Sequence, residues 1–393
     1  MNYIYNNEEE KNKMLERFCR YVKIWSESDS NAAEKGIFPS SECQWDFARI
    51  LENEIKNLGI KDVCLDENCY LIAKIPSSIE KEKESIPTIL LMAHIDTVDE
   101  VTGKNVNPVI IKEGQDTIVK SDGTTLLGAD DKAGVTAIMS TLAYLQEHKE
   151  IKHGPIEIMF SPDEETGHGM DKVPLEKLNA DFAITVDGGD IGELESECFN
   201  AFAASVKFTG KACHTGNAKA EGMINAATLA SNFVAGLPHE KSPECSQDYQ
   251  GFISPMEIRA SIESSEIQLL LRAFTMEEIE EEKKIIQDKA NEVIKKFGGN
   301  VEVTFKQQYL NMKDKMNEHP EVMQTLRKAF KDCDVEIKEV PIRGGTDGSR
   351  LTEMGIPTPN IFTGAHEFHS RKEWLSLNQM AKAADILLNI VTK

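Results

Sequence analysis

A run of apolar residues with the character of a buried strand ends in Leu91-Met-Ala-His94-Ile-Asp96-Thr97. Residues two apart in a strand point to the same side, so His94 and Asp96 can converge on one ligand. Alternatively, the Asp96 carboxylate can hold the His94 imidazole from behind, as happens for most metal-binding histidines. Taken alone the pair favours a structural role, and it becomes informative only together with the other acidic motifs.

Two further motifs place acids where a helix or a loop begins. The segment Leu-Gly-Ala-Asp-Asp at 127–131 opens an apolar helical stretch, so its acids fit an N-cap or a carboxylate directed at a metal. The segment Ser-Pro-Asp-Glu-Glu at 161–165 directly follows a buried strand. Its three carboxylates repel one another unless a cation or a raised pKa relieves the repulsion, or unless the loop is simply solvated.

Two more segments follow the same pattern. Asp187 ends an apolar strand, and His366 and His369 follow another strand, although a plain loop residue would fit each position equally well. Together the motifs gather histidines and carboxylates at strand ends, where an open α/β sheet binds its ligands. This mixed set of ligands suits Zn²⁺, Mn²⁺ or Co²⁺, and a bridging carboxylate suits two ions. The chain has no Ser nucleophile elbow, no Walker A loop and no Rossmann glycine fingerprint.

Alternating helices and strands must position these motifs. Apolar periodicity predicts helices at 8–25, 41–58 and 133–145, and strands at 69–75, 88–94, 156–160 and 182–186. Several of these strands are almost continuously apolar, as in a sheet that is covered on both faces. The alternation predicts an α/β fold, an α/β/α domain with a mostly parallel sheet.

A different pattern then interrupts the chain. Strands at 203–208, 257–262, 266–274 and 301–305 accompany helices at 224–235 and 276–296, which predicts an α+β unit. After Asn311 the α/β pattern returns, with helices at 320–330, 348–354 and 377–391 and strands at 334–340 and 358–362. We therefore predict a metal-binding catalytic domain at 1–203 and 313–393, and an inserted domain at 204–312.

Composition excludes several classes of protein. The 393 residues carry a formal net charge of −22, which disfavours binding to nucleic acid or to anionic membranes. No apolar run reaches the ~18 residues of a membrane span, and no signal peptide is recognisable at the N-terminus. The eight cysteines form no CxxC pair, so we expect reduced thiols and a cytoplasmic protein.

The sequence resembles the M20 metallopeptidases over essentially its whole length, and within them the tripeptide aminopeptidases of the peptidase T branch (M20B). The resemblance rests on His94-Ile-Asp96-Thr, Thr125-Leu-Leu-Gly-Ala-Asp130-Asp-Lys-Ala-Gly, Pro162-Asp-Glu164-Glu165, Thr185-Val-Asp187-Gly-Gly, Arg343-Gly-Gly-Thr-Asp-Gly, Asn360-Ile-Phe-Thr-Gly and His369. The Asp130 segment, and the Asp187 segment with the Gly192-Glu-Leu-Glu that follows it, are especially similar to the peptidase T branch.

The resemblance implies a role for each motif. Asp130 would bridge two zinc ions per chain, with Mn²⁺ or Co²⁺ as alternatives. One site would be completed by His94 and Asp187, and the other by Glu165 and His369. Two further acids would act beside the ions: Asp96 would orient the first histidine, and Glu164 would be the general base. Relatives also have a cis peptide bond between the residues that match Asp130 and Asp131.

The inserted domain resembles the family's lid and dimerisation domain, which implies a homodimer. Its His214 would help to stabilise the oxyanion, although Thr215 replaces the proline that commonly follows this histidine. Arg272 would face the substrate, with Asn311 and Arg343 as further candidates. Relatives often carry histidine where Ser254 stands, a departure that concerns the lid and not the chemistry.

The resemblance implies an aminopeptidase that releases the N-terminal residue from tripeptides by attack of a metal-activated water. Another M20 activity on the same site is the first alternative: a dipeptidase, a carboxypeptidase or an N-acyl amino acid deacylase. A non-enzymatic descendant would be expected to lack a ligand or the base, and none is lost here. A purely structural acidic protein would leave the clustering of acids and histidines at strand ends unexplained.

Overall fold

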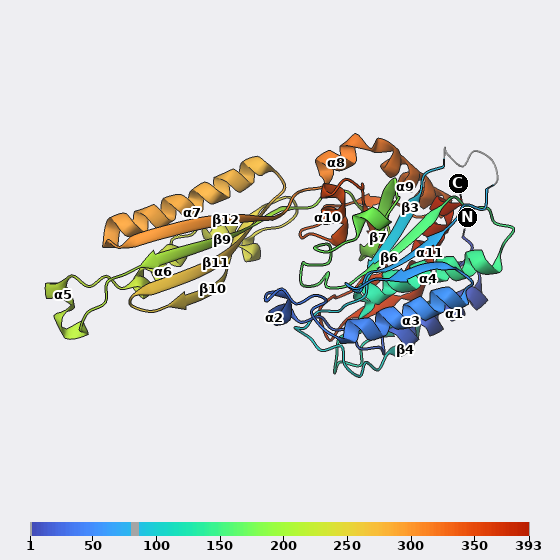
Figure 1. Ribbon diagram of the computed structural model, residues 1–393, viewed down its shortest axis with the longest axis horizontal. Coiled ribbons are helices and arrows are strands. Elements are labelled where there is room, and N and C mark those ends of the chain that lie inside the picture. The colour runs from blue at the N-terminus through green and yellow to red at the C-terminus, as the bar shows by residue number, and fades with distance from the viewer. Residues whose placement is uncertain (1, 80–85, 393) are drawn as a thin grey trace. The chain divides into compact units, whose positions relative to one another are not determined.

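The structure is a computed structural model that describes residues 2–79 and 86–392. It divides into a larger unit, formed by Met1–Ser196, Lys313–Val340 and Thr346–Lys393, and an inserted unit, formed by Glu197–Met312 and Pro341–Gly345. Each unit has its own sheets and its own helices (Figure 1).

The main sheet of the larger unit is a mixed sheet with a parallel centre. Its strand order is β1 (Asp62–Leu65), β2 (Leu71–Ile75), β6 (Ile156–Ser161), β3 (Ile89–His94), β7 (Phe182–Gly188), β14 (Asn360–Phe362), β8 (Glu193–Glu195) and β13 (Lys338–Glu339). The four central strands, β6, β3, β7 and β14, run parallel to one another. Antiparallel pairs flank them at β1–β2, β2–β6 and β14–β8. The predicted α/β fold is therefore confirmed.

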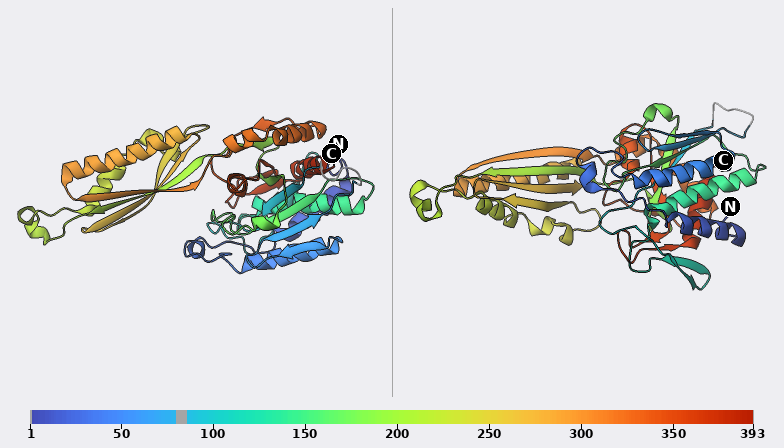
Figure 2. Two further views of the ribbon diagram at one scale, coloured as in Figure 1. Left: turned by 45° about the horizontal axis from the view of Figure 1, so that its top comes forward. Right: turned by 60° about the horizontal axis from the view of Figure 1, so that its bottom comes forward.

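Helices cover both faces of this sheet. The helices of the larger unit are α1 (Glu8–Tyr21), α2 (Ser30–Ala33), α3 (Cys43–Asn57), α4 (Ala129–Glu147), α8 (Lys313–Glu318), α9 (Pro320–Asp332), α10 (Asp347–Glu353) and α11 (Leu377–Val391). Helix α4 packs on β3 and β7, and most of its residues are buried. Leu90 and Met92 of β3 pack in a cluster with Leu351 of α10. In Figures 1 and 2, α1, α3 and α4 lie on one side of the sheet and α8 and α10 on the other.

A small second sheet of the larger unit was not predicted. It has the order β15 (Ala365–His366), β16 (Trp374–Ser376), β5 (Asp116–Lys120) and β4 (Val109–Glu113), and every pair in it is antiparallel. This sheet pairs the segment that follows β14 with the hairpin of β4 and β5, which lies much earlier in the sequence. None of the helices in the described part of the chain has the length and apolarity that crossing a bilayer requires.

The inserted unit is an antiparallel sheet with two helices on one face. Its strand order is β10 (Phe252–Ala260), β11 (Ser264–Ala273), β9 (Asn200–Thr209) and β12 (Asn300–Tyr309). Helices α6 (Ala226–Ala235) and α7 (Met276–Phe297) pack on it and on each other. Alternate residues of β11, namely Ile267, Leu269 and Leu271, join their core. Thr275 caps α7 by accepting a hydrogen bond from the Glu278 N–H.

The boundaries of the inserted unit differ from the predicted 204–312 at two places. Strand β9 begins at Asn200 and pairs with β11 along its whole length, so the unit starts before residue 200. The segment Pro341–Gly345 also belongs to it, because the Ile342 N–H donates to the Glu197 carbonyl over 2.9 Å. Neither contact has a local signal in the sequence, since each joins residues that are distant along the chain.

Helix α7 contains a fully buried acid, Glu282. Glu282 has no exposed surface, and neither of its carboxylate oxygens finds a hydrogen-bond partner among the described residues. Burial raises the pKa of Glu282 from the ordinary 4.5 to about 8, and the nearby Glu278 and Glu281 add to this effect against Lys241 and Arg272. The unfolded chain therefore ionises first, and stability falls as pH rises from about 4.5 to about 8.

Glu282→Met, which keeps the length of the side chain and removes the charge, should stabilise the protein at pH 8 and have little effect near pH 4.5. The expected gain at pH 8 is a few kcal/mol, because each unit by which the folded state raises the pKa of Glu282 corresponds to about 1.4 kcal/mol. Calorimetric unfolding of both variants across this pH range measures the difference. Glu280→Met, which replaces an exposed acid of the same helix, is the matched control. A pH-independent difference between wild type and Glu282→Met would contradict this account.

Candidate metal centre

Three adjacent parallel strands bring the sequence-predicted ligands to one edge of the main sheet. His94 is the last residue of β3, Asp187 lies near the end of β7, and Glu165 follows the end of β6. Because β6, β3 and β7 run parallel side by side, their carboxyl ends meet at the same edge. Asp130 reaches this edge from the first turn of α4, and His369 from the segment between β15 and β16.

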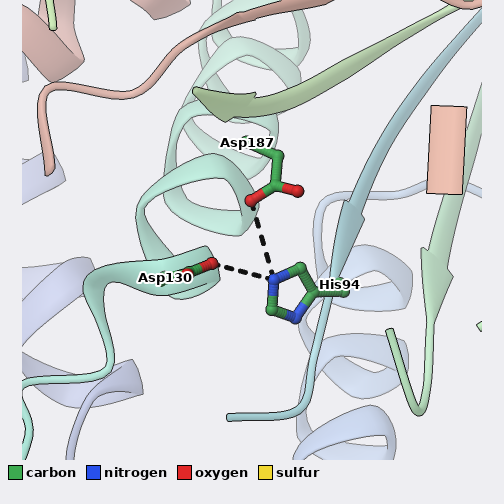
Figure 3. A group of neighbouring side chains, drawn as sticks. All are labelled: His94, Asp130 and Asp187. Atoms are coloured by element: carbon green, nitrogen blue, oxygen red, sulfur yellow. Dashed lines mark hydrogen bonds and ion pairs between the residues drawn. The ribbon is translucent and has the colours of Figure 1, made fainter. Parts of the chain in front are cut away.

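The first group of potential ligands consists of His94, Asp130 and Asp187. His94 Nε2 lies 3.0 Å from Asp130 Oδ1 and 3.6 Å from Asp187 Oδ1 (Figure 3). One potential ligand atom from each residue lies within 4.8 Å of the other two. The two carboxylates thus approach the same nitrogen from α4 and β7, as expected of residues around a single small cation.

The second group consists of Asp130, Glu165 and His369. His369 Nε2 lies 3.1 Å from Asp130 Oδ2 and 3.1 Å from Glu165 Oε2. Asp130 therefore belongs to both groups, with one carboxylate oxygen toward each histidine. A carboxylate in this position can bridge two ions. All five predicted ligands converge, although their roles toward a metal stay a prediction.

Burial and mutual repulsion perturb the ionisation of these acids. Burial, reinforced by the charge of Asp130, raises the pKa of Glu165 to about 8. Burial also raises the pKa of Asp187, to about 6, against the opposing effect of His94. For Asp130 the burial effect is outweighed by hydrogen bonds with His369 and His94, which hold its pKa below the usual range. Protons thus take part in balancing the negative charge of this edge.

The pKa values of the two histidines are raised as well. Hydrogen bonds with Asp130 and Glu165 raise the pKa of His369 to about 11. Burial alone would lower the pKa of His94, but hydrogen bonds with Asp130, Asp187 and Asp96 raise it well above the usual value. The crowded carboxylates therefore favour positive charge beside them, carried either by protons on the histidines or by bound cations.

The residues present fit a pair of divalent transition-metal ions. Glu165 Oε1 is buried and has no hydrogen-bond partner among the described residues, although the other oxygen of the same carboxylate contacts His369. A buried carboxylate oxygen normally finds a donor or a cation. Imidazole nitrogens with carboxylate oxygens are the ligands that zinc and its neighbours in the first transition row prefer.

Asp96 supports this centre more extensively than the sequence indicated. It has no exposed surface, and its Oδ1 lies 3.3 Å from His94 Nδ1, so its orienting role stays a prediction. The same carboxylate accepts hydrogen bonds from the Glu164 and Glu165 N–H groups, both over 3.1 Å. One side chain therefore fixes the histidine, the predicted base and a predicted ligand relative to one another.

The general-base candidate lies beside these groups. Burial raises the pKa of Glu164 well above its ordinary value, and the charges of Asp187, Asp347 and Glu165 add to this effect. Asp347 is a buried acid that the resemblance included in a motif without giving it a role, and it accepts a hydrogen bond from Ser161 Oγ over 2.5 Å. The peptide bond between Asp130 and Asp131 is cis, as the resemblance implies.

Two supporting residues were missed. Asn360 accepts a hydrogen bond from the Asp187 N–H over 3.0 Å through Oδ1, and donates one to Glu195 over 2.6 Å. Glu373 accepts hydrogen bonds from the main-chain N–H groups of Leu127, Gly128 and Asp130. The resemblance marked Asn360 as part of a motif without giving it a role, and nothing in the sequence near Glu373 indicates these distant partners.

The predicted substrate residues belong to the inserted unit. His214 accepts a hydrogen bond from the Gly216 N–H at Nδ1, over 3.1 Å, so its proton is on Nε2. Arg272 donates through Nη1 to the Phe202 and Leu271 carbonyls, and its guanidinium lies over the Tyr309 ring.

The other two candidates also make contacts within that unit. Asn311 accepts from the Cys198 N–H and donates to the Phe274 carbonyl. The Arg343 guanidinium donates to the carbonyls of Asp248 and Gln250 and to the Ser246 hydroxyl. These contacts fix strand ends and a loop, and the roles of Arg272, Asn311 and Arg343 toward substrate stay predictions.

Comparisons with known proteins agree with this picture. Residues 90–393 match the model of peptidase family M20/M25/M40. A peptidase T from Clostridium perfringens is 42% identical over 96% of this chain and 98% of its own. A peptidase T from Bacillus licheniformis is 42% identical over 97% and 98%.

Solved structures have the same fold. A tripeptidase from Staphylococcus aureus superimposes with a TM-score of 0.81 at 25% identity, over 97% of this chain and 98% of its own. The Bacillus subtilis YxeP protein, described as a dinuclear metal-binding peptidase of the M20 family, superimposes with a TM-score of 0.69 at 15% identity. It covers 98% of each chain and shows a likeness of fold.

Zn²⁺ binding should release protons, and its apparent affinity should fall as pH is lowered from 8 to 6. The reason is that the cation must displace protons held by Glu165, with a pKa of about 8, and by Asp187, with a pKa of about 6. Each proton released should weaken binding by up to about tenfold per pH unit. Calorimetric titration of metal-free protein in two buffers of different ionisation enthalpy counts the protons. An affinity that is constant between pH 6 and 8 would contradict the assignment of these ligands.

Proposed function

The chain belongs to peptidase family M20/M25/M40, and from this membership we propose that it is a metal-dependent aminopeptidase that releases the N-terminal residue from tripeptides. The observation that carries the proposal is the Asp130 carboxylate, one oxygen of which faces the His94 group and the other the His369 group. The relatives named peptidase T align over nearly the whole chain and supply the substrate class.

We assign two zinc ions to each chain, with Mn²⁺ or Co²⁺ as alternatives. His94 and Asp187 would hold one ion, Glu165 and His369 the other, and Asp130 both. When bound, the ions supply Lewis acidity and lower the pKa of the attacking water. The fully occupied centre would need fewer protons on its acids, because the cations take over the balancing of charge.

Glu164 is the general base of this proposal. Its main-chain N–H is held by Asp96, so its carboxylate is attached to a fixed point beside the predicted ligands. It takes a proton from the water that attacks the scissile carbonyl, and it later returns that proton to the leaving amine. A raised pKa suits a carboxyl group that must perform both transfers near neutral pH.

The inserted unit would supply the remaining groups. His214, with its proton on Nε2, can donate to the developing oxyanion. Arg272 can pair with the free α-carboxylate of the peptide, and acids of the metal centre can receive its α-ammonium group. Tripeptides would be selected if both charged ends of the peptide must be paired at once, because a dipeptide would be too short and a longer peptide would leave its carboxylate unpaired.

The assembly and location of the protein are also proposals. We infer a homodimer formed through the inserted unit, which sedimentation at micromolar concentration can measure. All eight cysteines are free thiols, and this supports a cytoplasmic location.

Glu164→Gln should keep the metal content of wild type and lose about 10²–10⁴-fold in kcat, the usual contribution of a general base. His369→Ala should instead lose metal. Metal analysis of gently purified protein and turnover of one tripeptide separate the two effects. Glu176→Gln, an exposed acid of the larger unit, is the control. Wild-type turnover by Glu164→Gln would reject its assignment as the base.

A tripeptide amide should be cleaved more slowly than the free acid. A hydrogen bond to a charged group is worth ~1.5–3 kcal/mol, so the expected difference in kcat/KM is roughly 10–150-fold. Arg272→Ala should abolish the difference, whereas Arg259→Ala, which replaces an exposed arginine of the neighbouring β10, should preserve it. Equal rates for acid and amide in wild type would reject the carboxylate contact.

The same assay tests the aminopeptidase activity itself. It compares one tripeptide with its N-acetyl form and with the matching dipeptide and tetrapeptide. Faster cleavage of the N-acetyl form would reject an aminopeptidase and favour an M20 deacylase or carboxypeptidase. Faster cleavage of the dipeptide would favour a dipeptidase.

A further inference from the structure

A buried carboxylate outside the predicted ligand set holds the turn that carries Asp130. Glu373 is 1% exposed, and its Oε2 accepts hydrogen bonds from the Leu127 N–H over 2.7 Å and the Gly128 N–H over 2.8 Å. Its Oε1 accepts a third, from the Asp130 N–H over 3.0 Å. Three main-chain donors of one turn therefore converge on a single side chain from a distant part of the sequence.

Helix α4 does not fix Asp130 by itself. Gly128, which precedes the helix, has a left-handed φ of 77°, and Asp130 has non-helical angles of φ −83° and ψ 106°. Residues in these conformations are outside the regular pattern of helical hydrogen bonds. The position of the Asp130 carboxylate, with one oxygen 3.0 Å from His94 and the other 3.1 Å from His369, must therefore be set by other contacts.

Glu373 is itself anchored beside the second predicted ligand group. Its carbonyl accepts a hydrogen bond from the Ser121 N–H over 3.0 Å, and the next residue, Trp374, begins β16 and pairs with Lys120 of β5. His369 lies only four residues earlier in the same segment. The Glu373 carboxylate thus connects the segment that carries His369 to the turn that carries Asp130.

We propose that Glu373 is a positioning residue that sets the Asp130 carboxylate between the two metal ions and so tunes the affinity of the centre for metal. This inference rests on the proposed function, because it takes Asp130 as the bridging ligand. A partner that orients a ligand in this way typically changes metal affinity or activity by ~10–100-fold when it is removed.

The amide variant tests the geometry with little change of shape. In Glu373→Gln, the amide oxygen can accept from Leu127 and Gly128 while its NH₂ group faces the Asp130 N–H, or the reverse. Either orientation leaves at least one of the three donors facing another donor. Glu373→Asp keeps the charge and shortens the reach, so it should retain part of the contacts.

A matched control is available in the same unit. Asp385 has no exposed surface and accepts hydrogen bonds from the Ile4 and Tyr5 N–H groups, over 2.7 Å and 3.0 Å. Asp385→Asn removes the same kind of buried carboxylate from main-chain donors, but from a segment that carries no predicted ligand. A purely structural role for Glu373 predicts that both variants lower the unfolding temperature and leave metal affinity unchanged.

The experiment measures the Zn²⁺ dissociation constants of full-length metal-free protein by competition with a chromophoric chelator, together with the unfolding temperature. Glu373→Gln should raise the dissociation constant of at least one ion by ~10–100-fold. Glu373→Asp should give a smaller increase, and Asp385→Asn should stay within about threefold of wild type even where it unfolds earlier.

Wild-type affinity in Glu373→Gln would overturn the positioning role, as would an equal loss of affinity in Asp385→Asn. Should Glu373→Gln fail to fold, Glu373→Asp decides the question, and an unchanged affinity there overturns the proposal. Failure of wild type to bind Zn²⁺ would instead contradict the proposed function, so the two outcomes are distinguishable.

Discussion

The Asp130 carboxylate, shared between two histidines at one edge of a parallel sheet, is the interaction on which the larger unit depends. Its two oxygens face His94 and His369 at 3.0 Å and 3.1 Å, and further acids surround it. Such a concentration of negative charge is costly at a buried site unless positive charge accompanies it. The surrounding structure meets this constraint with main-chain donors and rigid strand ends, and Asp96 alone organises three of the residues involved.

Much of this centre could be predicted from the sequence, because the topology of a parallel sheet determines which strand ends lie together. Acids and histidines that end parallel strands must lie at the same edge, so His94, Glu165 and Asp187 could be expected to meet before any contact was known. The parallel centre of the sheet was predictable for the same reason, from apolar strands that alternate with helices. The assignment of each residue to one ion or the other needed the family resemblance, since strand ends alone do not distinguish a bridging carboxylate such as Asp130 from the rest.

The remaining features depend on contacts between distant residues, which no local pattern encodes. The sheet formed by β15, β16, β5 and β4 unites segments on either side of the inserted unit, and the Glu373 contacts follow from that pairing. The early start of the inserted unit results from the pairing of β9 with β11. Asn311 and Arg343 carry side chains suited to binding substrate, yet their contacts with strand ends and a loop became visible only in three dimensions.

The place of the inserted unit within the chain has a consequence for synthesis on the ribosome. Strands β6, β3 and β7, with Asp130, all precede the insertion, whereas His369 and Glu373 follow it. At about 5–20 residues per second, the roughly two hundred residues between Glu165 and His369 take on the order of tens of seconds to translate. During that interval the nascent chain contains the acids Asp130, Glu165 and Asp187 but not yet His369. Protons on these carboxyl groups would have to balance their charge until the C-terminal segment has been translated.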